Sequence, residues 1–274
     1  MSRTHKVSGT GGVSLHVVEA GNPNGRSILF VHGVSFSHLA WRKQFESDLA
    51  DDFRLVAMDL RGHGFSDKPV GAYGDSRIWA DDVLAVLTSL ELDQPVLCGW
   101  SYGGFVLTDY VRHHGESTIA AMNFVSSVPR LGEPLLRGGF MGADFLALMP
   151  GTLSEKTDES AAALQAFAQK CVHDPLEPAE LAFFLGNLVM TPQHVRLALA
   201  MRQEDHDAVL STLRRPVLLT YGDEDVLVRP ATGEHMAGLV RHATLSRYPG
   251  VGHSALWEAP ERFNRELRQL RESI

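Results

Sequence analysis

The chain has 274 residues, of which 44% are hydrophobic, and a formal net charge of −8 at pH 7. This length suits one α/β domain with an inserted lid and a large buried core. The mild acidity and the lack of clustered lysine and arginine disfavour nucleic-acid binding. No apolar run approaches the roughly 20 residues that cross a bilayer, so we expect no membrane partner.

The first residues are polar and lack the apolar run of a signal peptide, so we expect a cytoplasmic protein. Cys98 lies in an apolar run and Cys171 in a distant helical segment. Two such cysteines fit a reducing compartment and disfavour a disulfide between them.

Short apolar runs that end in turn signals predict β-strands. They cover residues 13–18, 27–32, 54–60, 95–100, 120–127, 216–221 and 243–248. Most are continuously apolar, as expected when helices cover both faces of a parallel sheet. Helical spacing follows in residues 79–90 and 263–270. Strands that alternate with helices predict an α/β fold with a doubly wound, mostly parallel sheet.

The alternation breaks between about residues 129 and 213. This stretch contains helical patterns only, and no strand is needed there. The patterns cover residues 158–172, 178–190, 192–201 and 207–213, and Pro150-Gly151 is among the punctuating pairs. We therefore predict a core of residues 1–129 and 213–274, with residues 130–212 inserted as a helical cap, or lid.

The sharpest chemical signal is Gly99-Trp100-Ser101-Tyr102-Gly103-Gly104. It follows the strand at 95–100 and opens an apolar helix. Strand, tight turn and helix form the context of a nucleophile elbow, in which the serine attacks the substrate. The alternative is an ordinary loop serine between strand and helix.

A serine hydroxyl needs a base, and in this arrangement the acid and then the histidine follow the serine along the chain. Beyond the acid position, the candidates are His235, His242 and His253. His235 falls in a helical pattern and His242 precedes the last strand. His253 follows that strand in a glycine-rich loop, so we predict His253 as the base.

The acid should come just after a strand. Gly222-Asp223-Glu224-Asp225 follows the strand at 216–221 and offers three carboxylates. Asp225 is favoured, because the third residue after the glycine points back toward the site, whereas Asp223 is suited to stabilise the turn. The acid would hold the imidazole in the correct tautomer.

An oxyanion needs two main-chain N–H donors, one of them from the residue after the nucleophile, which is Tyr102. The loop after the strand at 27–32 supplies the other, and Val34 is the candidate. In the same loop, His32 is interpreted as a hydrogen-bonding brace. A second glycine-containing loop, residues 59–66, is interpreted as structural, with Asp59 and Arg61 tying loops together.

The motifs of this chain and their order along it resemble those of the α/β-hydrolase superfamily. They are the His32-Gly33 loop, residues 59–66, the Ser101 turn, Gly222 to Asp225 and Gly250 to His253. Within it, the chain is similar to small capped serine carboxylesterases, acyl-homoserine lactone hydrolases and cofactor-free haloperoxidase-like esterases. A serine nucleophile implies cleavage of esters or lactones through an acyl-enzyme. Alternatives are a hydrolase of carbon–carbon bonds in ring-fission products, a perhydrolase or haloperoxidase-like enzyme, and a hydrolase-fold receptor.

The resemblance implies no cofactor, and no matched cysteine and histidine spacing suggests a metal site. The expected partner is a small, largely apolar ester or lactone, bound by a monomer or homodimer. Large apolar residues in the cap and near the predicted mouth are candidates for the substrate pocket. We select Phe36, Trp41, Phe140, Phe145 and Trp257.

Overall fold

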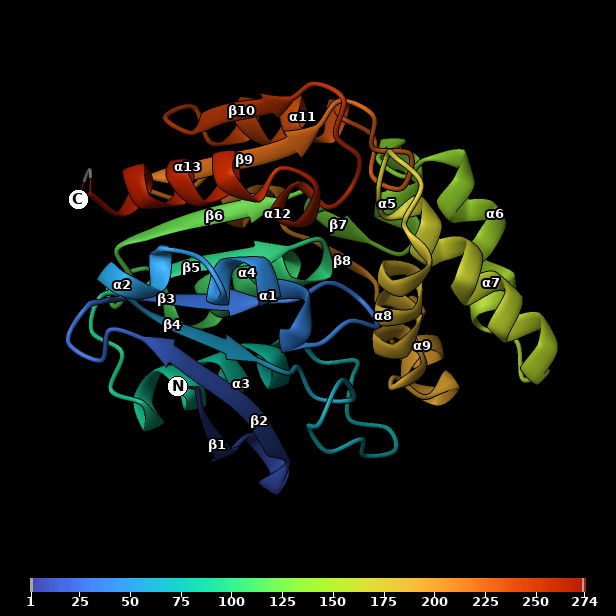
Figure 1. Cartoon of the computed structure of the whole chain (residues 1–274), viewed down its shortest axis with the longest axis horizontal. Coiled ribbons are helices and arrows are strands. Elements are labelled where there is room, and N and C mark those ends of the chain that lie inside the picture. The colour runs from blue at the N-terminus through green and yellow to red at the C-terminus, as the bar shows by residue number, and fades with distance from the viewer. Residues whose placement is uncertain (1, 273) are drawn as a thin grey trace.

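The computed structural model describes residues 2–272 and 274, and within them the central sheet has eight strands in the order β1-β2-β4-β3-β5-β6-β9-β10. Strand β2 runs antiparallel to β1 and β4, and the remaining neighbours are parallel (Figure 1). The strands are β1 (Arg3–Ser8), β2 (Ser14–Gly21), β3 (Arg26–Val31), β4 (Phe53–Met58), β5 (Val96–Trp100), β6 (Ala121–Val125), β9 (Val217–Gly222) and β10 (Thr244–Tyr248).

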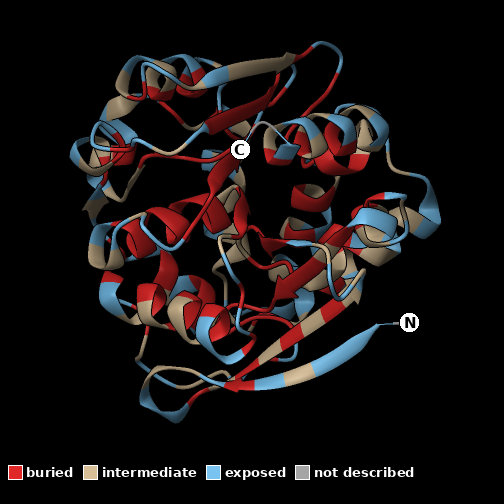
Figure 2. Cartoon of the chain, turned by 90° about the vertical axis from the view of Figure 1, so that its left-hand side faces the viewer, coloured by how far each residue is buried: buried red, intermediate tan, exposed pale blue. Residues whose placement is uncertain are grey.

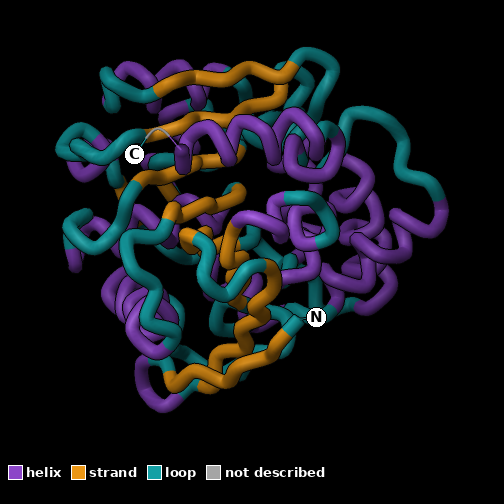
Figure 3. The backbone as a smooth tube through the Cα atoms, turned by 60° about the vertical axis from the view of Figure 1, so that its left-hand side comes forward, coloured by secondary structure: helices purple, strands orange, loops and turns teal. Residues whose placement is uncertain are grey.

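Helices cover both faces of this sheet, and the tube view shows them on either side of the twisted strands (Figure 3). Helices α3 (Ser76–Ser89), α4 (Tyr102–His114) and α11 (Ala231–Leu239) contribute to one apolar cluster. Helices α12 (Ala255–Glu258) and α13 (Pro260–Glu272) contribute to the other. In β3, Leu29 and Val31 join the first cluster, whereas Ile28 and Phe30 join the second. The continuously apolar strands thus bury both faces, and the predicted doubly wound fold is confirmed.

Short helical turns complete the core. They are η1 (Thr10–Gly12), η2 (His38–Trp41), α1 (Arg42–Phe45) and α2 (Leu49–Asp52).

Both cysteines are buried free thiols, as expected. No helix among the described residues is long and apolar enough to cross a membrane.

Strand β1 was not among the predicted strands. It lies at the edge of the sheet, and most of its residues are exposed (Figure 2). An edge strand needs little apolar surface, so Arg3–Ser8 lacks the apolar pattern by which the other strands are recognised.

Residues 130–212, called here the cap segment, lie between β6 and β9 in the sequence, and helices α6 to α9 lie beside the sheet (Figure 1). Helices α7 (Thr157–Lys170), α8 (Pro178–Val189) and α9 (Gln193–Ala200) match predicted helices, and α10 (Asp207–Leu210) matches the start of the last one. Helices α5 (Glu133–Gly138) and α6 (Ala143–Thr152) were not predicted. Helix α6 continues through Pro150, which the sequence suggested as a break.

The expectation that this stretch needs no strand was wrong. Strand β7 (Arg130–Leu131) pairs antiparallel with β8 (Glu204–Asp205). Two residues are too short to show a strand period, so the pair cannot be recognised from the sequence pattern. It joins the two ends of the cap segment.

Candidate active site

Ser101 occupies the turn between β5 and α4, at φ 53° and ψ −119°. A non-glycine residue at such an angle is strained and persists only where its surroundings fix it. The Ser101 N–H donates to the carbonyl of Val125 at 2.7 Å, and the Ser127 hydroxyl donates to the Ser101 carbonyl at 3.0 Å. The neighbouring strand therefore holds the turn in place.

The glycines around Ser101 allow its strand and helix to approach each other. A Cβ atom added to Gly103 would lie 2.1 Å from the carbonyl oxygen of Val31, and one added to Gly99 would lie 2.5 Å from the main-chain nitrogen of Gly104. No side chain fits at either position without moving the backbone. The glycines at these positions are thus a steric requirement of the turn.

His253 and Asp225 form a buried pair. Nδ1 of His253 lies 2.7 Å from Oδ2 of Asp225, and both side chains are almost fully buried. The other carboxylate oxygen accepts the N–H groups of Leu227 and Val228, each at 2.9 Å. With the carboxylate fixed on both sides, the imidazole is oriented through Nδ1.

Trp100 links this pair to the elbow. Its indole N–H donates to the carbonyl of His253 at 2.9 Å, and the two rings have centroids 5.6 Å apart. Trp100 directly precedes Ser101 in β5. The loop that carries His253 is therefore attached beside the serine.

The other carboxylates and histidines that the sequence offered for the acid and the base have different partners or are exposed. Asp223 pairs with Arg247 at 2.6 Å, and the side chain of Glu224 is exposed. His235 contacts Asp207 at 2.9 Å, and His242 contacts the carbonyl of Arg215. Of the three carboxylates in the 222–225 turn, Asp225 is the one that meets His253.

Val34 and Tyr102 line the same cavity as Ser101. A Cβ atom added to Gly33 would lie 3.2 Å from the Cβ atom of Ser101, so the loop before Val34 approaches the serine closely. Among the described residues, no main-chain hydrogen bond from the amide of Val34 or of Tyr102 occurs. Both residues therefore line the cavity and have amides with no main-chain acceptor among the described residues.

This cavity has a volume of about 180 Å³, and its surface is mainly apolar. Core residues around Ser101 form part of the wall, and helices α5, α6, α7 and α9 form much of the rest. Among the lining side chains from the cap segment are Leu135, Leu136, Met141, Phe145, Leu146, Met149, Leu164, Phe167 and Leu199. The cap segment therefore supplies much of the apolar surface of the cavity. Part of this surface comes from α5 and α6, two helices that the sequence did not predict.

Of the five aromatic residues selected for substrate binding, Phe145 lines the cavity. The other four do not line it, so these predictions were wrong, and their rings pack against other aromatic side chains. Phe36 packs on Trp100 with ring centroids 4.6 Å apart, and Trp41 packs on Phe30 at 4.8 Å.

Phe140 packs on His235, and Trp257 stacks on Phe183. The Trp257 indole also donates a 3.0 Å hydrogen bond to Glu180. The position of a residue near the site in the sequence does not determine the direction in which its side chain points.

The loop at residues 59–66 is held by buried polar contacts. Arg61 pairs with Asp82 through two nitrogens, at 2.6 and 2.7 Å, and both side chains are buried. Asp59 accepts the N–H groups of His38 and Phe65. These contacts join separate loops, in agreement with the structural interpretation of the motif.

His32 also acts as a brace. Its Nε2 accepts the N–H of Leu60 at 3.0 Å, and Nδ1 lies 2.8 Å from the carbonyl of Gly33. Burial lowers the pKa of His32 to about 4 and that of neighbouring His63 to about 3. Both imidazoles are therefore neutral near pH 7.

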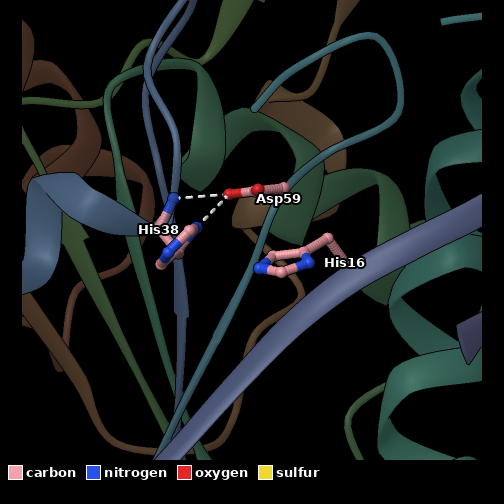
Figure 4. Close-up of side chains that lie close together, drawn as sticks. All are labelled: His16, His38 and Asp59. Carbon is pink, nitrogen blue, oxygen red and sulfur yellow. Dashed lines mark hydrogen bonds and ion pairs between the residues drawn. The ribbon is translucent and has the colours of Figure 1, made fainter. Parts of the chain in front are cut away.

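The sequence did not indicate the group formed by His16, His38 and Asp59 (Figure 4). One candidate ligand atom from each of these residues lies within 4.8 Å of the other two. Both oxygens of Asp59 already accept N–H groups, and Nδ1 of His38 lies 2.8 Å from Oδ1. Asp59 is thus already held by hydrogen bonds to the loops that carry His38 and Phe65.

The turn at Ser101 stands where the α/β-hydrolase fold has its nucleophile elbow, between a central parallel strand and the helix that covers it. The model of the alpha/beta hydrolase family matches residues 28–266, and the chain belongs to this family.

Relatives carry hydrolase and peroxidase names. The chain is 30% identical to the non-heme chloroperoxidase CPO-A1 of Kitasatospora aureofaciens, over 90% of the chain and 92% of that protein. It is 28% identical to the bifunctional esterase/perhydrolase DCH of Acinetobacter calcoaceticus, over 93% and 95% of the two chains. The esterase RhEst1 from Rhodococcus sp. ECU1013 superposes with a TM-score of 0.93 at 35% identity, over 98% of each chain. The resemblance to esterases and haloperoxidase-like proteins is confirmed.

Proposed function

We propose that this hydrolase cleaves carboxylic ester or lactone bonds of small, largely apolar substrates, with Ser101, His253 and Asp225 as its catalytic triad. The observation that carries the proposal is the strained Ser101 turn at an apolar cavity, joined through Trp100 to the buried His253–Asp225 pair. The esterase names of RhEst1 and DCH support the same reaction class.

The proposed mechanism begins with attack of the Ser101 hydroxyl on the substrate carbonyl. His253 takes the serine proton while Asp225 stabilises the imidazolium. The main-chain N–H groups of Val34 and Tyr102 donate to the oxyanion, where each donor is typically worth about 10²–10³ in rate. His253 then returns the proton to the departing alcohol, which leaves an acyl-enzyme on Ser101.

Water completes the cycle. His253 removes a proton from the water as it attacks the acyl carbonyl, and the proton passes to Ser101 when the acid is released. The cap segment would act as the lid of this site. The apolar lining that it contributes supports an apolar acyl or alcohol group in the substrate.

A substrate panel tests the proposal. The wild-type chain and Ser101→Ala are assayed with nitrophenyl esters and homoserine lactones, and each is treated with a fluorophosphonate probe followed by mass spectrometry. Turnover and labelling at Ser101 are expected in the wild type and should be lost in Ser101→Ala. Ser211→Ala, a change of an exposed serine, is the matched control. Hydrolysis by Ser101→Ala at the wild-type rate would refute the assignment.

Perhydrolysis is a second candidate, because the similar proteins include a chloroperoxidase and an esterase/perhydrolase. Hydrogen peroxide would replace water as the attacker of the same acyl-enzyme and release a peracid. Peracid formation from a simple carboxylic acid and hydrogen peroxide, measured in the same variants, distinguishes this activity from hydrolysis alone.

A further inference from the structure

The cavity at Ser101 contains one charged side chain, that of Arg196 on helix α9, among the described residues that line it. None of the described lining residues is an aspartate or a glutamate. The other polar lining residues are Ser35, Ser101, Tyr102 and Thr152, which are neutral. A single cation therefore stands in the wall of an otherwise apolar cavity that also contains the proposed nucleophile.

Arg196 is held by neutral oxygens. Nε donates to the carbonyl of Thr152 at 2.7 Å, Nη2 donates to the hydroxyl of Ser160 at 3.2 Å, and Nη1 donates to the carbonyl of Thr191. No ion pair of Arg196 occurs among the described residues. Two other buried arginines, Arg61 and Arg202, each pair with a carboxylate, Asp82 and Asp109 respectively, whereas Arg271, outside the cavity wall, has no ion pair among the described residues either.

The charge of Arg196 is thus poorly compensated. The residue is 9% exposed, and burial lowers the pKa of its guanidinium, although arginine stays protonated in proteins. A guanidinium has five N–H groups, and the three contacts above leave donors unused. A buried cation with spare donors favours an anionic partner, and a carboxylate can accept two parallel hydrogen bonds from it.

A purely structural role explains part of this arrangement. Thr152 ends α6, and Thr191 follows the end of α8, so Arg196 binds carbonyl groups at two helix ends where partial negative charge gathers. These contacts fix the guanidinium in position. They supply no full negative charge to balance that of Arg196 in the cavity wall.

We propose that Arg196 binds the carboxylate of a monoanionic substrate, in which an apolar chain separates this carboxylate from the ester bond that Ser101 attacks. The inference rests on the proposed esterase function and narrows its substrate class to esters with a distal acid group, such as half-esters of dicarboxylic acids. The apolar side chains that line the cavity would contact the chain of this substrate, and Arg196 in the same wall would bind its carboxylate.

The test compares matched substrates. Nitrophenyl half-esters of dicarboxylic acids, from four to eight carbons, are assayed beside neutral nitrophenyl esters of equal chain length. In the wild type, kcat/KM for the half-ester should exceed that of its neutral partner at one preferred length. In Arg196→Met, the ratio of the two kcat/KM values should fall by roughly 10- to 100-fold, the range for hydrogen bonds to a charged group. Arg196→Lys should restore part of the ratio.

Arg137→Met is the matched control. It removes an exposed arginine of the cap segment that does not line the cavity, so the ratio should stay within about threefold of the wild type. Thermal unfolding of all variants measures the structural role separately. A wild-type enzyme that hydrolyses neutral esters but shows no Arg196-dependent preference for half-esters would overturn the inference and leave the esterase proposal intact.

Binding gives an answer that does not depend on turnover. Calorimetry with monoethyl adipate and its neutral diester compares Ser101→Ala with the double variant Ser101→Ala/Arg196→Met. Tighter binding of the monoanion that disappears in the double variant supports the subsite even if the esterase proposal fails. Equal binding of the monoanion to both variants contradicts it.

Discussion

The guanidinium of Arg202, in the cap segment, donates a 2.7 Å hydrogen bond to the phenol oxygen of Tyr102, the residue directly after Ser101. A second nitrogen of Arg202 lies 2.9 Å from Asp109 on the same helix, α4, and both charged side chains are fully buried. The cap segment is therefore attached to the helix that begins at the proposed nucleophile.

Tyr102→Phe should lower the free energy of unfolding by about 1–3 kcal/mol, because it leaves a buried donor of Arg202 without its acceptor. Ester hydrolysis should persist, since the proposed oxyanion donor is the main-chain N–H and not the phenol. Urea unfolding and kcat/KM measure the two effects. Tyr110→Phe is the control, because its hydroxyl meets the neutral side chain of Thr118. An equal loss of stability in both variants would argue against a special role of the Arg202 contact.

Asp225→Asn should reduce kcat by about 10³–10⁴, because the amide no longer holds the Nδ1–H tautomer of His253 or stabilises its cation. The assay is hydrolysis of a nitrophenyl ester at saturating concentration. Asp223→Asn changes a neighbouring carboxylate that pairs with Arg247, and should stay within a few-fold of wild type. If Asp225→Asn keeps more than a tenth of the wild-type rate, Asp225 is not the acid of the triad.

Acid should destabilise the fold through His32 and His63. Their folded-state pKa values, about 4 and about 3, lie below the ordinary value of 6.5, so the unfolded chain binds these protons more tightly. Their contribution to stability is complete above pH 6.5. It is lost as the pH falls toward 4, at roughly 1.4 kcal/mol per pH unit for each imidazole.

Comparison of His63→Asn with wild type isolates this effect. Between pH 6 and 4.5, the free energy of unfolding should depend less steeply on pH in the variant, by roughly 1.4 kcal/mol per unit. Denaturant unfolding at several pH values gives the slope. His242→Asn, at an exposed position, should leave it unchanged. Parallel slopes for wild type and His63→Asn would show that His63 takes up its proton without unfolding.

Gly103→Ala should destabilise the fold by roughly 3 kcal/mol or more and abolish hydrolysis, because the new Cβ atom would lie 2.1 Å from the Val31 carbonyl oxygen. Gly238→Ala in α11 meets no atom within 4 Å and should raise stability by up to about 1 kcal/mol. Thermal unfolding of the two variants measures the expected loss of stability in the first and the expected gain in the second. A folded, active Gly103→Ala would contradict the steric account of the turn.

The sequence predicted β3, β4, β5, β6 and β9 well because these parallel strands bury both faces and are therefore mainly apolar, whereas the edge strand β10 is only partly buried. Ser101, Asp225 and His253 could be selected because each follows a strand, and the order of such residues along the chain is a sequence property. Arg196 was not predicted as a site residue. In the sequence of an amphipathic helix, a buried arginine cannot be distinguished from one that faces solvent. Its burial depends on how α6, α7 and α9 pack.

The aromatic residues predicted to bind substrate also show that burial and side-chain direction cannot be predicted from the sequence pattern alone. Phe36 and Trp257 stand close in sequence to Val34 and His253, yet their rings fill space between helices and strands away from the cavity. A pattern of residue types indicates that a large side chain will be buried. It does not say on which side of its backbone the side chain lies, and helix packing decides that.

Strands β6 and β9 are neighbours in the sheet, and the short β7–β8 pair fastens together the two ends of the chain that connects them. Arg130 on β7 strengthens this junction through Asp205 on β8, at 3.1 Å. The entropy of closing a loop between fixed ends rises only slowly with its length. Segments of other lengths can therefore be inserted at this junction without changing the pairing of β6 and β9, provided that they keep a cationic partner for the buried Asp109, which now pairs with Arg202. A change in this segment would alter the apolar wall of the cavity while the strands of the sheet keep their pairing.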